Sequence, residues 1–282
     1  MNAALNAPPA AAAPKKPALR NLKKALKRGL PFVLAAWLIP WVLLAWLVFG
    51  LLDLARNRPF NLALLGRYFT GNGRFTWLLS PFNLLLDLLA LPYTNRGIYR
   101  LEDLPPGHQA EIRALIDAAH RREVIKLLDA KLGGQKRGMI FFKWYGRNIP
   151  CSVDVPEFQA PYRHIRTVGV SIFNKKQSTD RHFGPLRVSL RFLYNINPVD
   201  DPNVFIEVGD RIHRWRDERV FVFDDTLMHR SVNEADAVRY CLFVDVLRPA
   251  GLPWVMSWAM ALVGLLLSPF KRVFYRNWTF LK

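Results

Sequence analysis

Alternating short segments between residues 138 and 249 constrain the fold of this chain more than any other feature. They lie at residues 166–173, 187–196, 204–208, 220–223 and 238–246, and Pro, Asp, Asn and Gly residues separate them. Successive side chains of a strand point to opposite faces, so Arg239 and Cys241 are expected to share a face with Phe243 and Asp245. Many short strands with such breaks predict a mainly β domain, a double-stranded β-helix with the jelly-roll architecture of cupins.

Two histidines of this segment, His182 and His229, belong to separate expected strands. Neutral imidazoles suit Fe(II), and such sites keep positions open for a cosubstrate and dioxygen. A guanidinium on a nearby strand, that of Arg239, suits a carboxylate because its planar fork can pair with both oxygens. Arg191 lies on another alternating segment, and a cation inside a barrel mouth is costly unless an anion binds there. The pattern indicates an iron site beside a dicarboxylate site.

Several motifs are spread over residues 138–249: Phe142-Lys143-Trp144-Tyr145-Gly146, His182-Phe183-Gly184-Pro185, Glu207-Val208-Gly209-Asp210, the block 220–229, and Asn233, Arg239 and the run 245–249. Together they resemble the aspartyl/asparaginyl β-hydroxylase family of 2-oxoglutarate-dependent oxygenases. The resemblance implies Fe(II), 2-oxoglutarate and dioxygen as cofactors, with His182 and His229 as iron ligands. It also implies that Arg239, helped by Ser171, holds the distal carboxylate of 2-oxoglutarate. Arg191 is the next candidate for that carboxylate.

Gly184 departs from the pattern of many related oxygenases, which place an iron-binding Asp two residues after the first histidine. Glycine has no side chain to offer, so the resemblance implies that water completes the iron shell. Asp225 is the expected carboxylate that orients this water, because partners just outside a metal shell fix the geometry of the groups within it.

Two apolar segments flank the domain, at residues 31–52 and 249–270. Each contains 22 residues without a charge, and one helix of that length would span about 33 Å at about 1.5 Å per residue. These lengths predict membrane-associated helices on both sides of the catalytic domain. A third apolar stretch, 75–91, contains Pro81, Asn83 and Asp87, which favour an interfacial or re-entrant helix.

The chain has a net charge of +18, and its N-terminal part is wholly basic, because no acidic residue precedes Asp53. Basic residues there accompany leucines at helical spacing, a pattern typical of an amphipathic lead-in to a membrane rather than of a nucleic-acid surface. Cys151 and Cys241 lack disulfide or metal spacing, which favours a reducing compartment. We therefore expect the bacterial inner membrane, with the catalytic domain facing the cytoplasm. This placement requires either a hairpin of 31–52 with 75–91 or a bend at Pro40 that creates a monotopic anchor.

The sequence thus predicts five parts: a basic arm (1–30), an apolar membrane anchor region (31–92), a helical linker (93–137), the oxygenase domain (138–249) and a C-terminal membrane-associated helix with a basic tail (250–282). Residues 80–105 look like the approach segment of membrane-bound lipid A acyl-chain hydroxylases. That resemblance implies hydroxylation of an acyl chain of lipid A or an ornithine lipid, at the 2-position. The alternative is a membrane-tethered aspartyl/asparaginyl peptide or protein β-hydroxylase. A non-enzymatic scaffold would have lost the ligands that this chain retains.

Overall fold

The computed structural model describes residues 29–31, 33–34, 37, 39–93, 97–121, 124–132, 135–267 and 279–280. Nearly all of the predicted basic arm and most of the predicted basic tail lie outside these residues. The chain forms two compact units, 1–48 and 49–282, and the second contains the described β-structure.

Two sheets, one of eight strands and one of four, dominate the described part of the second unit. The larger has the order β1 (Ile98–Tyr99), β9 (Val220–Phe223), β6 (Ser189–Asn195), β11 (Arg239–Leu247), β4 (Ile165–Phe173), β2 (Arg137–Trp144) and β12 (Thr279–Phe280), and β3 (Arg147–Asn148) also pairs with β2. The smaller has the order β5 (Gln177–Ser178), β10 (His229–Asn233), β7 (Val204–Val208) and β8 (Arg211–Arg214). Neighbouring strands are antiparallel except for β12 with β2.

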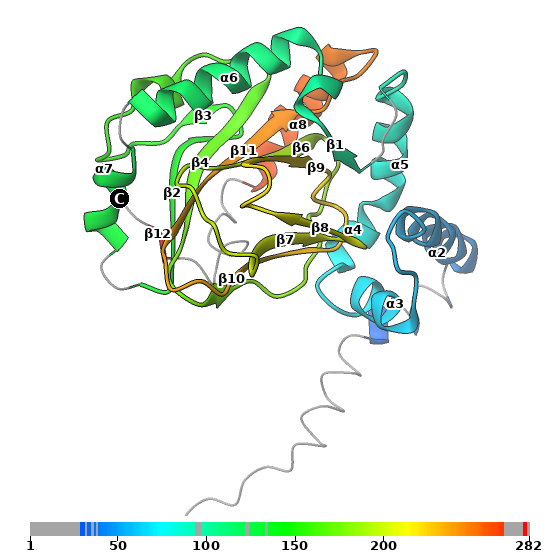
Figure 1. Cartoon of the computed structure of the whole chain (residues 1–282). Helices are drawn as coiled ribbons and strands as arrows, with labels where there is room; N and C mark the ends of the chain where they lie inside the picture. The colour runs from blue at the N-terminus through cyan, green and yellow to red at the C-terminus, as the bar shows by residue number, and fades with distance from the viewer. Residues whose placement is uncertain are drawn as a thin grey trace, which may run out of the picture. The chain divides into compact units, whose positions relative to one another are not determined.

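Of the strands β4 to β11, four belong to the larger sheet and four to the smaller (Figure 1). Their order is β4-β11-β6-β9 in the larger sheet and β5-β10-β7-β8 in the smaller, so the first strand of this series pairs with the last. That order fits the jelly roll that the sequence predicts. The mainly β prediction is confirmed, and each predicted strand lies within two residues of an observed one.

The two faces of β11 separate the hydrophobic core from the interior between the sheets. Leu242 and Val244 belong to a core cluster that also includes Ile112 and Leu115 of helix α6 (Pro106–Arg121). Helix α7 (Val124–Leu132) contributes to the same cluster. One face of the larger sheet completes the cluster, and both helices pack against that face (Figure 1). The helices predicted for residues 93–137 therefore share the core of the β domain. Arg239 and the other residues of its face are left for the interior.

The apolar flanks form shorter helices than the sequence predicts. Helix α2 spans Pro40–Leu54 and helix α8 spans Pro253–Leu267, each with 15 residues. Both begin at a proline, whose missing N–H is tolerated in the first turn but not in a helix interior. In the described residues, each of these helices is therefore shorter than the 22 residues that the sequence predicts. None of the helices in the described residues has the length and apolar character required to span a bilayer.

Between α2 and the β domain lie helices α3 (Leu62–Phe69), α4 (Arg74–Leu78) and α5 (Ser80–Leu89). The stretch predicted as one interfacial helix, 75–91, is thus divided between α4 and α5. Pro81 lies in the first turn of α5, where its ring is compatible with a helix start. In Figure 1 these helices lie beside one end of the two sheets.

Candidate iron and dicarboxylate site

A cavity of about 370 Å³ lies between the sheets. All six residues that the sequence singled out line it: Ser171, His182, Arg191, Asp225, His229 and Arg239. They come from β4, the loop before β6, β6 itself, the loop after β9, β10 and β11. The fold therefore gathers residues from six separate segments into one chamber, which is the arrangement that an iron and dicarboxylate site requires.

His182 and His229 are held as a pair by their own backbones. The N–H of each residue donates to the carbonyl of the other at 2.9 Å, and the ring centroids lie 4.2 Å apart. Each Nδ1 faces a backbone carbonyl, that of Asp180 at 2.7 Å and that of Leu227 at 2.8 Å. Because a carbonyl oxygen can only accept, each Nδ1 carries the proton and each Nε2 retains its lone pair.

Burial lowers the pKa of both histidines, and for His229 the neighbouring His182 lowers it further. Both rings are therefore neutral near pH 7, which is the protonation state that binds a metal. In the described residues no third His, Cys, Asp or Glu joins them in a metal-binding group. Two imidazole donors with the remaining positions open fit the Fe(II) site expected from the sequence.

Asp225 occupies the space that a side chain at residue 184 would need. A Cβ built on Gly184 would lie 2.5 Å from Cγ and from Oδ1 of Asp225. The N–H of Gly184 also donates to the Asp225 carbonyl at 2.6 Å, which draws the two loops together. Glycine at this position therefore allows a carboxylate from the other loop to enter the chamber.

The Asp225 carboxylate is largely enclosed, with its side chain 14% exposed, and it accepts a hydrogen bond from Arg191 at 2.8 Å. Burial raises the pKa of Asp225 to about 6, although Arg191 opposes the shift, while Asp245 adds to it. A carboxyl group with a pKa near 6 can accept or donate a hydrogen bond close to neutral pH. The proposed role of orienting an iron-bound water is compatible with this position.

Arg191 and Arg239 differ in whether a carboxylate of the protein neutralises their charge. Arg191 pairs with Asp225 at 2.8 Å and with Asp245 at 2.9 Å, and its guanidinium lies 3.7 Å from the centre of the Phe243 ring. Its charge is thus already balanced by two carboxylates of the protein. This arrangement favours Arg239 over Arg191 as the partner of an added carboxylate.

Arg239 is 1% exposed, yet it forms no ion pair within the described residues. One terminal nitrogen donates to Ser231 Oγ at 2.7 Å, and the guanidinium lies over the rings of Phe173 and Trp215. Nε and the other terminal nitrogen have no hydrogen-bond partner among the residues described. Burial lowers the pKa of Arg239. A buried cation with unused donors fits the carboxylate of a dicarboxylate ligand.

Two serines accompany Arg239, one predicted and one not. Ser171 lines the cavity opposite Cys241 in the β4–β11 pairing, and its hydroxyl donates to the Cys241 carbonyl at 3.3 Å. Ser231, which holds the guanidinium, was not identified from the sequence. Strand alternation could have found it, because it lies two residues after His229 on β10 and so faces the same side.

Helices α4 and α5 hold the loop that follows His182. Thr76 Oγ1 donates to the Gly184 carbonyl at 2.8 Å. The Asn83 side chain donates to the Pro185 carbonyl at 3.3 Å and accepts from the Arg187 N–H at 3.0 Å. These contacts join residues about a hundred positions apart, and sequence reasoning did not identify them. The predicted anchor region therefore also positions a predicted iron ligand.

A buried ion network extends from this loop. Arg187 pairs with Asp53 of α2 and Asp87 of α5, and its Nε lies 3.4 Å from Asp224. Burial by itself would raise the pKa of Asp224, but Arg56, Arg187 and Arg248 lower it well below its ordinary value. The network thus links two helices to both loops that carry the histidines.

The segment that contains the cavity residues is similar to known proteins. The model of the aspartyl/asparaginyl beta-hydroxylase family matches residues 117–249. An ornithine lipid ester-linked acyl 2-hydroxylase of Rhizobium tropici is 31% identical over 98 residues, which are 34% of this chain and 35% of that protein. The chain therefore matches about a third of the length of that relative.

Two solved structures are similar over part of their length. An oxidoreductase of the 2OG-Fe(II) oxygenase family from Burkholderia pseudomallei is 13% identical, with a TM-score of 0.33, and the match covers 47% of this chain and 80% of that one. AviO1 of Streptomyces viridochromogenes Tue57 is 15% identical, with a TM-score of 0.31, over 56% of this chain and 90% of that one. Residues 117–249, which include all six cavity residues, are thus similar to the aspartyl/asparaginyl β-hydroxylase family, and the acyl 2-hydroxylase of Rhizobium tropici is a relative over 98 residues.

Proposed function

We propose that this chain is an Fe(II)/2-oxoglutarate-dependent dioxygenase that hydroxylates its substrate. The observation that carries the proposal is the pairing of two neutral histidines with a buried, unpaired arginine in one cavity. Burying a cation is costly, so the fold retains Arg239 at an energetic cost that an anionic ligand would offset. A dicarboxylate can place one end at Arg239 and the other at the histidine pair.

His182 and His229 would hold the iron through Nε2, and Arg239 would bind the distal carboxylate of 2-oxoglutarate through its unused N–H groups. When bound there, iron with 2-oxoglutarate and dioxygen would supply the oxidation: 2-oxoglutarate would yield succinate and carbon dioxide, and one oxygen atom would enter a substrate C–H bond. Asp225, placed beside Gly184, would accept a hydrogen bond from a water near the histidines. Phe173, Leu193, Ile206 and Phe243 line the chamber and exclude bulk water.

For the substrate we propose an acyl chain of a membrane lipid, lipid A or an ornithine lipid, with oxygen added at the 2-position. The named activity of the Rhizobium tropici relative supports a lipid. Exposed apolar residues on helices next to the site support it as well. On α5 they are Phe82, Leu85 and Leu88, which are 51% to 64% exposed. On α8 they include Trp254 and Trp258, at 63% and 73%.

Helices α5 and α8 share one buried cluster, in which Leu86 and Ala90 accompany Met256 and Met260. Their opposite sides carry the exposed residues, so both helices offer apolar surface next to one another. An apolar surface of this kind on a soluble domain marks an interaction site, and aromatic residues favour a bilayer interface. We propose that it rests on the inner membrane, with the β domain on the cytoplasmic side.

The proposal can be tested by mass spectrometry of lipids from bacteria that express the chain. We expect a lipid that is one oxygen atom heavier, with the oxygen on an acyl chain, and no such lipid with His182→Ala or His229→Ala. Each variant should remain folded but lose iron binding and succinate formation. If lipids are unchanged while a peptide gains a β-hydroxyl group, the membrane-tethered peptide hydroxylase replaces the lipid enzyme. Full activity of either histidine variant would contradict the site itself.

A further inference from the structure

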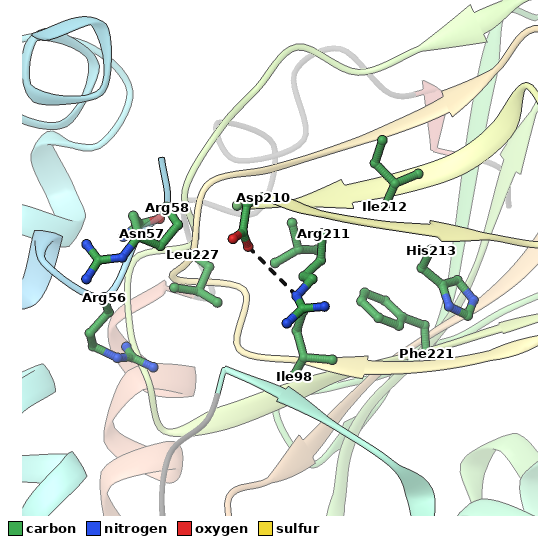
Figure 2. A pocket seen from close by; sticks show the side chains of 12 residues that line it. Arg56, Asn57, Arg58, Ile98, Asp210, Arg211, Ile212, His213, Phe221 and Leu227 are labelled. Atoms are coloured by element: carbon green, nitrogen blue, oxygen red, sulfur yellow. Dashed lines mark ion pairs between the residues drawn. The ribbon is translucent and has the colours of Figure 1, made fainter. Parts of the chain in front are cut away.

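A second cavity, of about 560 Å³, lies apart from the iron chamber (Figure 2). None of its lining residues also lines the chamber. The segment after α2 supplies Arg56, Asn57 and Arg58, and the turn and strand after β7 supply Asp210, Arg211, Ile212 and His213; Ile98, Val208, Gly209, Phe221 and Leu227 complete it. The cavity therefore draws on the helical segment and on both sheets. Two of the motifs contribute residues to it, but the sequence did not predict a cavity there.

Three arginines and one acid line this cavity. Arg58 is exposed, and Arg211 has a side chain 78% exposed whose Nε lies 4.0 Å from Asp210. Arg56 donates to Asp224 at 2.7 Å, but its other terminal nitrogen is buried without a hydrogen-bond partner among the described residues. Burial lowers the pKa of His213, so that ring adds no charge near pH 7. The net charge of the lining is positive, and it includes an unused buried N–H donor.

The floor of the same cavity is apolar. Ile98, Phe221 and Leu227 line it, and the His213 ring stacks on Phe221 with centroids 4.4 Å apart. In Figure 2 Arg56 and Arg58 lie on one side of these apolar groups, and Arg211 lies between Leu227 and Phe221. An inorganic anion would interact with the arginines alone and would make no use of the apolar residues. A cationic rim above an apolar floor suits a molecule that carries an oxyanion next to hydrocarbon.

The arginine segment is fixed to the loop that carries His229. Asn57 is 3% exposed, and its side-chain oxygen accepts from the Met228 N–H at 2.7 Å. The Met228 carbonyl accepts from the Gly209 N–H at 2.8 Å. Gly209 has a φ of 58°, and a Cβ there would lie 3.1 Å from the Arg58 carbonyl. Backbone packing thus fixes the cavity wall one residue away from His229, a predicted iron ligand.

We propose that this second cavity binds an oxyanion, a phosphate or carboxylate group, carried by an amphiphilic molecule. Arg58 and Arg211 would contact the oxyanion, and the apolar residues of the lining would receive the adjoining hydrocarbon. Its use as the headgroup site of the oxidised lipid rests on the proposed function. The loop that it shares with His229 would then place the headgroup at a fixed position relative to the iron.

The test uses the full chain with Arg58→Gln and Arg211→Gln combined. The matched control combines Arg163→Gln and Arg214→Gln, which removes the same charge from exposed arginines outside both cavities. Calorimetry measures the binding of inorganic phosphate. Co-sedimentation measures binding to vesicles of phosphatidylcholine alone and of phosphatidylcholine with phosphatidylglycerol. We expect the cavity variant to lose about tenfold or more in affinity for the oxyanion, while the control retains it.

The two arms identify the source of the oxyanion. Loss of phosphatidylglycerol-dependent vesicle binding in the cavity variant alone assigns the site to a lipid headgroup, whereas loss of phosphate binding alone assigns it to a soluble ligand. If both variants lost affinity equally, binding would depend only on general surface charge, and the proposed site would be wrong. The site would also be wrong if the parent chain bound neither probe.

Turnover separates this inference from the proposed function. If the cavity variant loses oxyanion binding as expected while the parent oxidises no lipid, the cavity remains a binding site and the lipid hydroxylase assignment fails. If the parent oxidises lipid and the cavity variant binds both probes as the control does, the second site fails and the hydroxylase assignment remains.

Discussion

At the scale of single residues, the site depends on the charge of Arg239, which no carboxylate of the described residues neutralises, and on the absence of a side chain at Gly184. Arg191 is neutralised by two carboxylates, whereas Arg239 is enclosed by two aromatic rings and one serine hydroxyl. Gly184 leaves the space that Asp225 fills. The unbalanced charge of Arg239 lowers the stability of the empty site but prepares it for an anionic ligand, a common compromise at functional sites.

Replacing Arg239 with methionine should separate binding from stability. Methionine is unbranched and flexible, although shorter, and it removes a buried unpaired charge, so the ligand-free variant should be at least as stable as the parent. It should lose about 2 kcal/mol or more of 2-oxoglutarate binding, which is on the order of thirtyfold in affinity. Thermal unfolding with and without 2-oxoglutarate measures both effects. Arg239→Lys should recover part of the binding, and an unchanged affinity in the methionine variant would move the carboxylate site elsewhere.

Gly184→Ala should destabilise the chain through Asp225. The added methyl group overlaps the Asp225 carboxylate, and overpacking of this kind costs about 1 to 3 kcal/mol. In an Asp225→Ala background the same substitution should cost much less, because the overlapping atoms are gone. Urea unfolding of the four chains measures the coupling between the two residues. Equal costs in both backgrounds would show that residue 184 does not meet Asp225.

At the scale of elements, two short helices position the loop that carries His182. Thr76 of α4 and Asn83 of α5 bond to the backbone at residues 184, 185 and 187. The same helices expose apolar side chains on their other side, among them Phe75 and Phe82. A surface proposed to meet the membrane and a loop proposed to hold iron are thus parts of one helical segment.

Thr76→Val should weaken the iron site more than it changes the fold. Valine has nearly the same shape but cannot donate to the Gly184 carbonyl, and one lost buried hydrogen bond costs about 1 to 2 kcal/mol. We expect weaker Fe(II) binding by titration, with the β domain intact by circular dichroism. Thr70→Val is the control, because the hydroxyl of Thr70, the residue that follows α3, donates to the Gly66 carbonyl of that helix and not to the His182 loop in the described residues. Equal iron affinities for the two variants would exclude a positioning role for Thr76.

At the scale of the whole second unit, buried ion pairs attach the helices to the β domain. Arg187 joins Asp53 and Asp87 to Asp224, and Tyr68 adds a hydrogen bond to Asp53 at 2.5 Å. Breaking one partner of a buried network leaves an uncompensated charge, which costs about 3 to 5 kcal/mol. The attachment therefore determines both stability and the relative placement of the two histidine loops.

Asp224→Asn should lower the free energy of unfolding at pH 7 and remove part of its pH dependence. Because the folded state lowers the pKa of Asp224, the ionised carboxylate stabilises the fold above its unfolded pKa, about 3.9. That contribution is lost as the pH falls below this value, so the gap between parent and variant should narrow in acid. Asp236→Asn, whose side chain is 79% exposed and pairs with Lys176, is the control. Urea unfolding at neutral and acidic pH measures both free energies. A difference between parent and variant that did not change with pH would contradict the prediction.

The sequence by itself determined the strands, the mainly β class and the six residues of the chamber. Strand alternation is a local property with a period of two, so it indicated which side of β11 carries Arg239 before any pairing was known. The motifs around His182 and His229 are likewise contiguous in the chain. Membrane placement and the lipid substrate stay predictions, and the long apolar flanks were expected as longer helices than Pro40 and Pro253 allow.

Only the tertiary structure decided what each site residue contacts. The carboxylates that neutralise Arg191, the clash that requires Gly184, the threonine that holds its loop and the arginines of the second cavity all depend on segments far apart in the chain. Alternation determines which face a side chain takes, but sheet order and helix docking determine what lies opposite that face. Those arrangements follow from burial of the whole core, a property that no local stretch of sequence contains.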